Sequence, residues 1–223
     1  MIPVLAGLID HAPTFPPARL PVNKALAEDR RVRESADAWI AGRLVWPADR
    51  VAELAGYDRV PLSLVLSAHV PVPGTGTWPI EAVEARWPAI PAFDGEVFVE
   101  VPIDDSLEES LARVRQAGAL AKVRCGGERV PSPAELARFV RACAELELPF
   151  KASAGLHHAV RRGGAHGFLN LLAAAARPEE AESLLADEQL SVDDVPAERG
   201  PFRSFGSCSF AEPVAELREL GML

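Results

Sequence analysis

Short apolar runs alternate along the chain with longer segments whose apolar residues recur at helical spacing. Runs of this length, bounded by Gly, Pro and polar residues, are typical of β-strands. They occupy residues 4–9, 43–46, 62–67, 97–103, 120–125, 150–153 and 202–208. The helical spacing predicts helices over residues 24–41, 48–55, 79–86, 107–117, 133–146, 167–176, 178–187 and 213–220.

Two of the predicted helices have clear start signals. Ser132-Pro-Ala-Glu135 and Ser106-Leu-Glu-Glu109 both have the Ser-x-x-Glu spacing of a capping box. Repeated strand–helix units imply parallel strands that are buried on both faces. Seven strands and a weaker eighth candidate at residues 190–195 approach the count for a (β/α)8 barrel. We therefore predict a single α/β domain over residues 1–223 that resembles a TIM barrel; the alternative is an open doubly wound parallel sheet.

Composition narrows the class of protein and of partner. The net charge of −9 argues against nucleic acid or an anionic membrane as a partner. The longest apolar stretch, residues 167–176, is too short to cross a bilayer. Three cysteines without close spacing disfavour a disulfide framework and a structural zinc site. We expect a cytoplasmic protein that needs no cofactor, and we leave open whether it forms a homo-oligomer.

Two lysines end consecutive predicted strands. Side chains alternate across a strand, so Lys122 shares a face with Arg124, and Lys151 shares a face with Ser153. A lysine in apolar, cationic surroundings favours its neutral amine, which can attack a carbonyl to form a Schiff base. The alternative is a structural role in which the lysines form salt bridges, for instance to Glu100 on the preceding strand.

The residues at these strand ends predict a charged cluster. We expect Glu100, Lys122, Arg124 and Lys151 to lie together with more cation than anion, and at least one lysine to have a lowered pKa. Arg124 is the expected partner of Glu100, because a guanidinium binds a carboxylate in bidentate fashion. Such a cluster suits a small anionic substrate.

A Gly- and Ser-rich segment, Gly206-Ser-Cys-Ser209, precedes the last predicted helix. Exposed amides, hydroxyls and the helix dipole favour an anion at such a place. Gly206, Ser207 and Ser209 are therefore candidate anion contacts. The alternative role is helix capping, because Ser209-Phe-Ala-Glu212 also has the spacing of a capping box.

Histidines follow the strand that carries Lys151. His157 is a candidate for proton transfer and His158 for hydrogen bonding to a substrate. Asp10, at the end of the first strand, is a further candidate substrate contact, and His69 follows the third strand. If Asp10 and the histidines converge, a metal-assisted lyase, isomerase or hydrolase is an alternative. A third possibility is a barrel that binds an anion or a partner protein without catalysis.

Residues 120–127, 149–155 and 202–209 resemble, in order and texture, the last strands of deoxyribose-phosphate-aldolase-like class I aldolases. That family has a Schiff-base lysine, a second lysine in Lys-Ala-Ser-Gly-Gly, and a Gly-Thr-Ser-Ser phosphate loop. The resemblance implies a lyase with Lys122 as Schiff-base former, Lys151 as the neighbour that favours its neutral form, and phosphate contacts at the candidate serines. Arg124 stands where the family has a small hydroxyl residue. The whole chain also resembles a group of bacterial proteins that share an Asp followed by a Phe-Pro-Pro-Ala loop.

Overall fold

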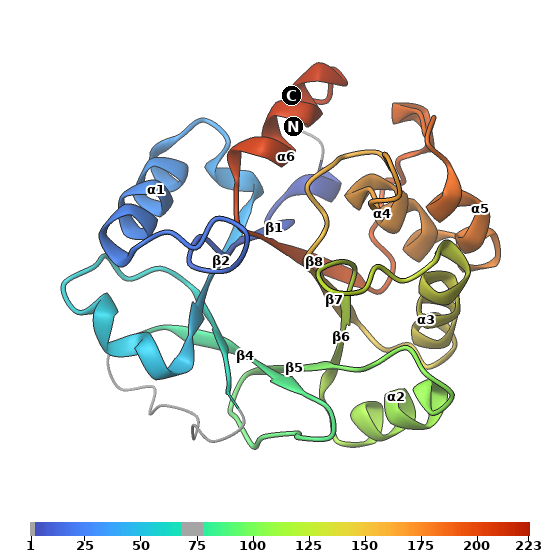
Figure 1. Cartoon of the computed structure of the whole chain (residues 1–223), viewed down its shortest axis with the longest axis horizontal. Helices are drawn as coiled ribbons and strands as arrows, with labels where there is room; N and C mark the ends of the chain where they lie inside the picture. Colours follow the sequence, from blue (N-terminus) through green and yellow to red (C-terminus); the bar gives the residue numbers. More distant parts are fainter. Residues whose placement is uncertain (1–2, 68–77) are drawn as a thin grey trace.

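A computed structural model describes residues 3–67 and 78–223. Eight parallel strands follow one another in chain order and close into a barrel, because β8 pairs with β1 as well as with β7 (Figure 1). The predicted (β/α)8-like barrel is confirmed, and the open sheet is excluded. The strands are β1 (Ile9–His11), β2 (Ala41–Pro47), β3 (Leu62–Val65), β4 (Ile80–Arg86), β5 (Glu96–Glu100), β6 (Leu120–Arg124), β7 (Phe150–Ser153) and β8 (Phe202–Ser207).

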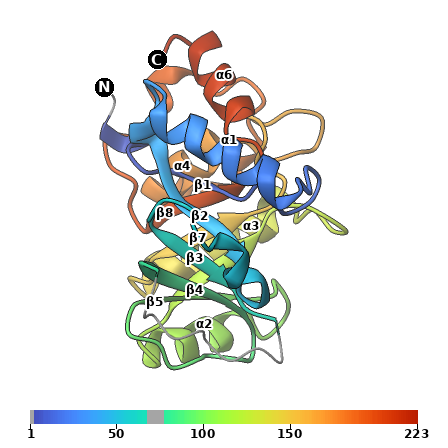
Figure 2. The ribbon, with the colours of Figure 1, turned by 90° about the vertical axis from the view of Figure 1, so that its left-hand side faces the viewer.

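Helices surround the barrel unevenly. In the side view of Figure 2, α1 and α6 lie at one end of the molecule and α2 at the other, with the strands between them. Residues 87–95, which join β4 to β5, contain no helix. The α-helices are α1 (Val22–Glu34), α2 (Leu107–Gln116), α3 (Pro133–Glu145), α4 (Phe168–Ala176), α5 (Ala181–Ala186) and α6 (Ala211–Glu219). Short 3-10 helices occupy Pro3–Leu5, Ala38–Ile40, Ala48–Leu54, Pro178–Glu180 and Val192–Asp194.

The eighth strand of the barrel is β4, and the sequence prediction placed that strand wrongly in two respects. Helical spacing predicts a helix over residues 79–86, and Ile-Glu-Ala-Val-Glu-Ala-Arg is also rich in helix-forming residues. In the structure this segment pairs with β3 and β5, and these tertiary contacts outweigh its local preference. The weak strand candidate at residues 190–195 instead contains the 3-10 helix Val192–Asp194.

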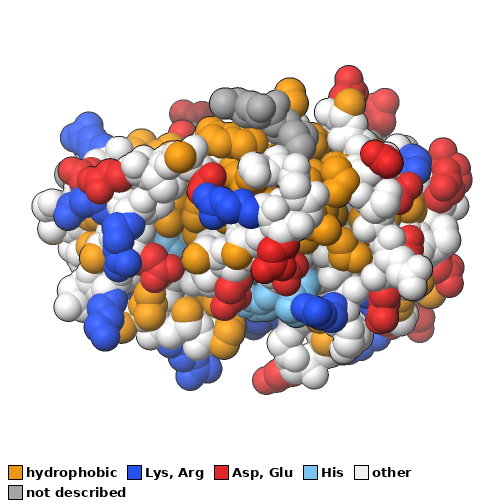
Figure 3. All heavy atoms as spheres, turned by 90° about the horizontal axis from the view of Figure 1, so that it is seen from above, with side chains coloured by type: hydrophobic (Ala, Val, Ile, Leu, Met, Phe, Trp, Pro, Cys, Tyr) orange, Lys and Arg blue, Asp and Glu red, His pale blue; other side chains and the backbone are white. Residues whose placement is uncertain are grey.

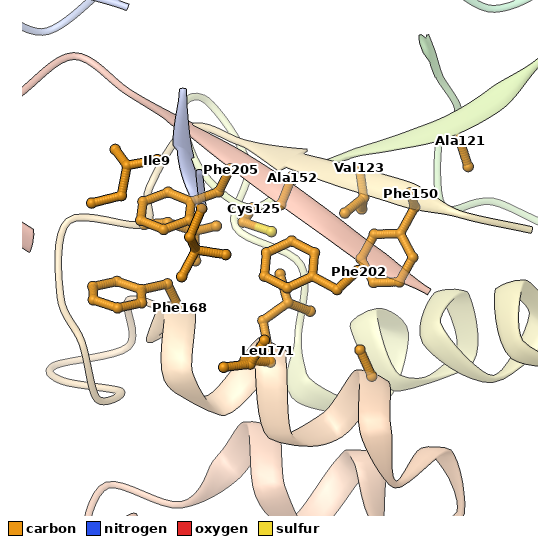
Figure 4. Close-up of a cluster of buried hydrophobic side chains, with 14 of the residues drawn as sticks. Ile9, Ala121, Val123, Cys125, Phe150, Ala152, Phe168, Leu171, Phe202 and Phe205 are labelled. Carbon is orange, nitrogen blue, oxygen red and sulfur yellow. The ribbon is translucent and has the colours of Figure 1, made fainter. Parts of the chain in front are cut away.

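Aromatic side chains pack between the last strands and the helices outside them (Figure 4). Phe150 on β7 packs edge-on against Phe139 of α3 and lies beside Phe202 of β8, with ring centroids 5.3 Å apart in both pairs. Phe168 of α4 stacks on Phe205 at 4.9 Å. All five rings are fully buried. Such pairs stabilise by about 0.5–1.5 kcal/mol beyond burial alone, so this layer holds β7 and β8 firmly in place.

The two predicted capping boxes have different outcomes. Ser132 Oγ accepts a hydrogen bond from the Glu135 amide at 3.2 Å, and Glu135 Oε2 accepts one from the Ser132 amide at 2.7 Å. This box starts α3 as predicted. The box expected at Ser106 does not form, because Ser106 Oγ donates to Asp104 Oδ1 at 2.7 Å.

Ser132→Ala is expected to lower the free energy of unfolding by about 1 kcal/mol, since the amide at the start of α3 loses its acceptor. Urea unfolding would measure the change. Ser106→Ala is the matched control, because the Ser106 side chain caps no amide of α2. An equal loss in both variants would contradict a specific role for the capping box.

Candidate active site

A pocket of about 300 Å³ opens at the carboxyl ends of the strands. Every strand, or the loop that follows it, contributes to the lining, as expected for a (β/α)8-like barrel. The polar residues that line it are Glu84, Arg86, Glu100, Lys122, Arg124, Lys151, Ser153, His157 and Ser207. The pocket therefore joins most of the candidate residues predicted from the sequence.

The two lysines meet at the floor of this pocket. They are register partners on β6 and β7, and Lys151 is fully buried while Lys122 is 6% exposed. Lys122 Nζ lies 2.9 Å from Glu84 Oε2 and 2.9 Å from Glu100 Oε2. Lys151 Nζ lies 2.6 Å from Glu84 Oε1 and 2.7 Å from Asp10 Oδ2. Glu84 thus bridges the two ammonium groups.

Hydroxyl and amide donors complete the coordination of the buried carboxylates. Ser63 Oγ donates to Glu84 Oε1 at 2.7 Å, and Ser204 Oγ donates to Asp10 Oδ2 at 2.8 Å. The amide of Arg43 donates to Asp10 Oδ1 at 2.8 Å. Buried charges persist when they are paired and hydrogen-bonded in this way.

The charges of this cluster set its protonation. Burial by itself raises the pKa of Glu84, but the ammonium groups of Lys151 and Lys122 outweigh burial and hold that pKa well below its usual range. Burial lowers the pKa of Lys151, but the carboxylates of Asp10 and Glu84 outweigh it and raise that pKa above its ordinary value. Lys151 is therefore cationic at neutral pH, and Glu84 is anionic.

The expectations about the cluster have different outcomes. The pocket lining carries Arg86, Lys122, Arg124 and Lys151 against Glu84 and Glu100, so cations are in excess there as predicted, although three carboxylates face the two lysines deeper in the barrel. The pKa of Lys151 is raised, so the expectation that at least one lysine has a lowered pKa is not met at this residue. Lys122 is the nearest partner of Glu100, since the Arg124 guanidinium stays 3.8 Å away and forms no bidentate pair.

Glu84 is the main residue that the sequence did not reveal. Its segment was predicted as a helix, so its place at the end of a strand was hidden. A signal was present: Glu84 is a single carboxylate within the apolar run Ala82-Val83-Glu84-Ala85, and that run is buried in the structure. A charge inside a buried run needs a partner, and here the partners are the two lysines.

The Gly206–Ser209 segment reaches the pocket wall, and both of its serine side chains form hydrogen bonds near the start of α6. Gly206 and Ser207 line the pocket. Ser207 Oγ donates to the Ser209 carbonyl at 2.6 Å, and Ser209 Oγ accepts from the Glu212 amide at 3.3 Å. This bond to the Glu212 amide is one of the two in the predicted capping box, and α6 itself begins after Phe210. Contact with an anion stays a prediction.

The two histidines are bound to carboxylates of α6. His157 Nδ1 lies 3.1 Å from Glu212 Oε2, and His158 Nδ1 lies 2.7 Å from Glu216 Oε1. His157 lines the pocket, whereas Asp10 is held by Lys151 in the barrel interior. Within residues 3–67 and 78–223, no three His, Cys, Asp or Glu side chains are grouped so as to hold a metal ion. His69 lies outside the described residues.

Surface charge can be compared with the pocket on the face that Figure 3 shows. On the face shown in Figure 3, basic side chains are interspersed with acidic ones, and the described atoms form no extended basic surface there. Among the described helices, none has both the length and the apolar character needed to span a membrane.

Lysine usage sets the pocket apart from the rest of the chain. Of the 23 basic Lys and Arg residues, three are lysines: Lys24, Lys122 and Lys151. Two of these three lie inside the barrel, where an amine has chemistry that a guanidinium lacks. No protein-family model and no curated protein matches the sequence, so a function for this chain has to be inferred from the geometry of the pocket.

Proposed function

We propose that this protein is a Schiff-base-forming lyase of the aldolase type, with Lys122 as the amine that attacks a substrate carbonyl. The observation that carries the proposal is the position of Lys122 Nζ, which lies in the pocket within 2.9 Å of two carboxylates. An amine in this position has both access to a substrate and groups that can accept its proton.

Lys122 must first become a neutral amine. Glu100 is the better proton acceptor of its two neighbours, because Glu84 is stabilised as an anion by both lysines and by Ser63. Glu100 lies nearer to the mouth of the pocket, with its side chain 14% exposed. A proton that moves from Lys122 to Glu100 leaves a lone pair on Nζ without creating a new net charge in the interior.

The neutral amine then adds to the carbonyl carbon, and a proton moves from the nitrogen to the former carbonyl oxygen to give a carbinolamine. Glu100 returns its proton to the hydroxyl group of this adduct, which leaves as water, and the resulting iminium ion carries the positive charge of the former ammonium group. Glu84 and Glu100 remain close to that charge and stabilise it. His157 lines the same pocket and is the candidate for proton transfer to and from the substrate.

Lys151 acts through its charge. It is fully buried behind Lys122 and shares Glu84 with it, so its ammonium group competes for the same carboxylate. A fixed cation that contacts the same carboxylate as a neighbouring amine favours the neutral form of that amine. The raised pKa of Lys151 supports this role, because its charge stays in place while Lys122 reacts.

Borohydride reduction in the presence of small aldehydes and ketones tests the proposal. We expect a stable secondary-amine adduct on Lys122, located by peptide mass spectrometry. Lys24 is an internal control, since it is exposed on α1 and does not line the pocket. Equal labelling of Lys24 and Lys122, or no adduct on Lys122 with any carbonyl, would rule out the proposed mechanism.

A further inference from the structure

The two sides of the pocket differ in chemistry. Glu84, Glu100 and the two lysines form one side, on β4 to β7. The opposite side carries side chains without polar groups, contributed by β2, β3 and the loop after β1: Ala12, Phe15, Pro16, Val45, Val65 and Leu66. Phe15 and Pro16 belong to the Phe-Pro-Pro-Ala loop, which thus walls the pocket. An apolar wall of this kind is suited to a hydrocarbon group of the ligand.

Two arginines lie at the mouth of the pocket, on the same side as the lysines. Arg86 and Arg124 both line the pocket, at the ends of β4 and β6. Each guanidinium lies 3.8 Å from Glu100 Oε1, which is beyond hydrogen-bonding distance. Neither guanidinium forms a side-chain hydrogen bond with the described residues, so both can bind an anionic ligand group, which a guanidinium can hold in bidentate fashion.

The spacing of these groups limits how far the anionic group can lie from the reacting carbonyl. The same Glu100 carboxylate contacts Lys122 Nζ through Oε2 at 2.9 Å and approaches Arg124 through Oε1 at 3.8 Å. Lys122 and Arg124 are also two residues apart on one strand and face the same side. The carbonyl and the anionic group must therefore be separated by only a few bonds.

The remaining walls do not suit a phosphorylated, hydroxylated substrate. Ser207 Oγ donates its proton to the Ser209 carbonyl, and Ser209 does not line the pocket. A polyol buried against the apolar side would leave hydroxyl groups without partners, at a cost for each one. Ser153 Oγ is buried at the pocket without a hydrogen-bond partner, so it can serve a single polar group of the ligand.

We infer that the substrate is a short oxo acid with a hydrocarbon arm. Its carbonyl lies at Lys122, its carboxylate binds Arg124 and Arg86, and its arm packs against the apolar wall around Val65. This inference rests on the proposed Schiff-base chemistry at Lys122. It departs from the phosphorylated substrate that the aldolase resemblance implies.

Four carbonyl compounds separate the contributions of the carboxylate and the arm. 2-Oxohexanoate has both groups, 2-hexanone lacks the carboxylate, and pyruvate lacks the arm. Dihydroxyacetone phosphate is a phosphorylated hydroxyketone. The rate of adduct formation on Lys122 under borohydride, at equal concentrations, is the readout. We expect 2-oxohexanoate to react fastest, by about tenfold or more over 2-hexanone, as one charge-assisted hydrogen-bonded contact implies.

Two variants assign these preferences to residues. Arg124→Met is expected to reduce the advantage of 2-oxohexanoate over 2-hexanone by about tenfold. Arg129→Met is its matched control, because it removes the same charge from the neighbouring hollow without altering the lining of the pocket. Val65→Thr should reduce the advantage of 2-oxohexanoate over pyruvate by about fourfold, the value of one buried methyl group.

The outcomes distinguish this inference from the function on which it rests. If no compound gives an adduct on Lys122, the proposed function fails, and the inference fails with it. If adducts form but dihydroxyacetone phosphate reacts fastest, or all four compounds react equally, the inference is overturned and the Schiff-base function stands. Equal effects of Arg124→Met and Arg129→Met would also overturn it, because the preference would then reflect only overall charge.

Discussion

Lys151→Met is expected to destabilise the protein by about 3–5 kcal/mol, although it replaces a buried charge with an apolar side chain of similar length. Lys151 Nζ contacts Asp10 at 2.7 Å and Glu84 at 2.6 Å, and both carboxylates are buried. Without the ammonium group, Asp10 keeps only neutral donors and Glu84 keeps one lysine. The free energy of unfolding, from urea titrations at pH 7, measures the effect.

The free energy of unfolding that Lys151→Met loses should depend on pH, because folding shifts the pKa values of both Glu84 and Lys151 in the wild type. The pKa of Glu84 is lowered by folding, so its contribution to stability is present above the ordinary glutamate pKa and is lost as pH falls. The pKa of Lys151 is raised by folding, so its contribution is present below the ordinary lysine pKa and is lost as pH rises through the folded value. The acidic and alkaline limits of the wild type therefore both involve this cluster.

In Lys151→Met the ammonium group that favours the Glu84 anion is lost, so this carboxyl group gains a proton more readily. Once it is neutral, it no longer needs a cation beside it. The stability difference from the wild type should then be largest near neutral pH and should narrow toward about pH 4.5. Lys24→Met is the control for loss of a surface charge, and it should change stability by less than about 0.5 kcal/mol. A neutral or stabilising effect of Lys151→Met at pH 7 would show that the carboxylates do not depend on this cation.

Lys122→Arg is expected to abolish the adduct while the fold is retained. A guanidinium keeps the positive charge opposite Glu84 and Glu100, but it does not lose a proton and cannot attack a carbonyl. Adduct formation should fall by more than about 10³-fold, in line with the loss of a nucleophile in other enzymes. Borohydride trapping and far-UV circular dichroism measure the two properties separately.

Lys122→Met completes the comparison. It should also lose the adduct, and it should be less stable than Lys122→Arg, because Glu84 and Glu100 then face one cation fewer at the pocket floor. If Lys122→Arg retained full adduct formation, the reacting amine would lie elsewhere, and the other buried amine, Lys151, would be the next candidate.

Much of the barrel follows from local sequence patterns. Strands β2, β3, β5, β6, β7 and β8 coincide with the short apolar runs, since a strand buried on both faces needs continuous apolar residues. The period of two along a strand also placed Lys122 and Arg124 on one face of β6, and Lys151 and Ser153 on one face of β7. The parallel register then brings the two lysines side by side, as the sequence predicted.

Local patterns failed where contacts between distant segments outweighed them. The β4 segment is composed largely of helix-forming residues, and only its pairing with β3 and β5 makes it a strand. This segment carries Glu84, so the error in secondary structure also hid the carboxylate that links both lysines.

The balance of charge in the pocket is likewise a tertiary property. Asp10 and Lys151 are 141 residues apart in the chain and meet only because the barrel closes between β8 and β1. The residue types and their spacing were enough to place two amines at the ends of neighbouring strands. Closure of the sheet decided which carboxylates face those amines, and it thereby set the raised pKa of Lys151, because a pKa depends on distances in space that sequence separation does not determine.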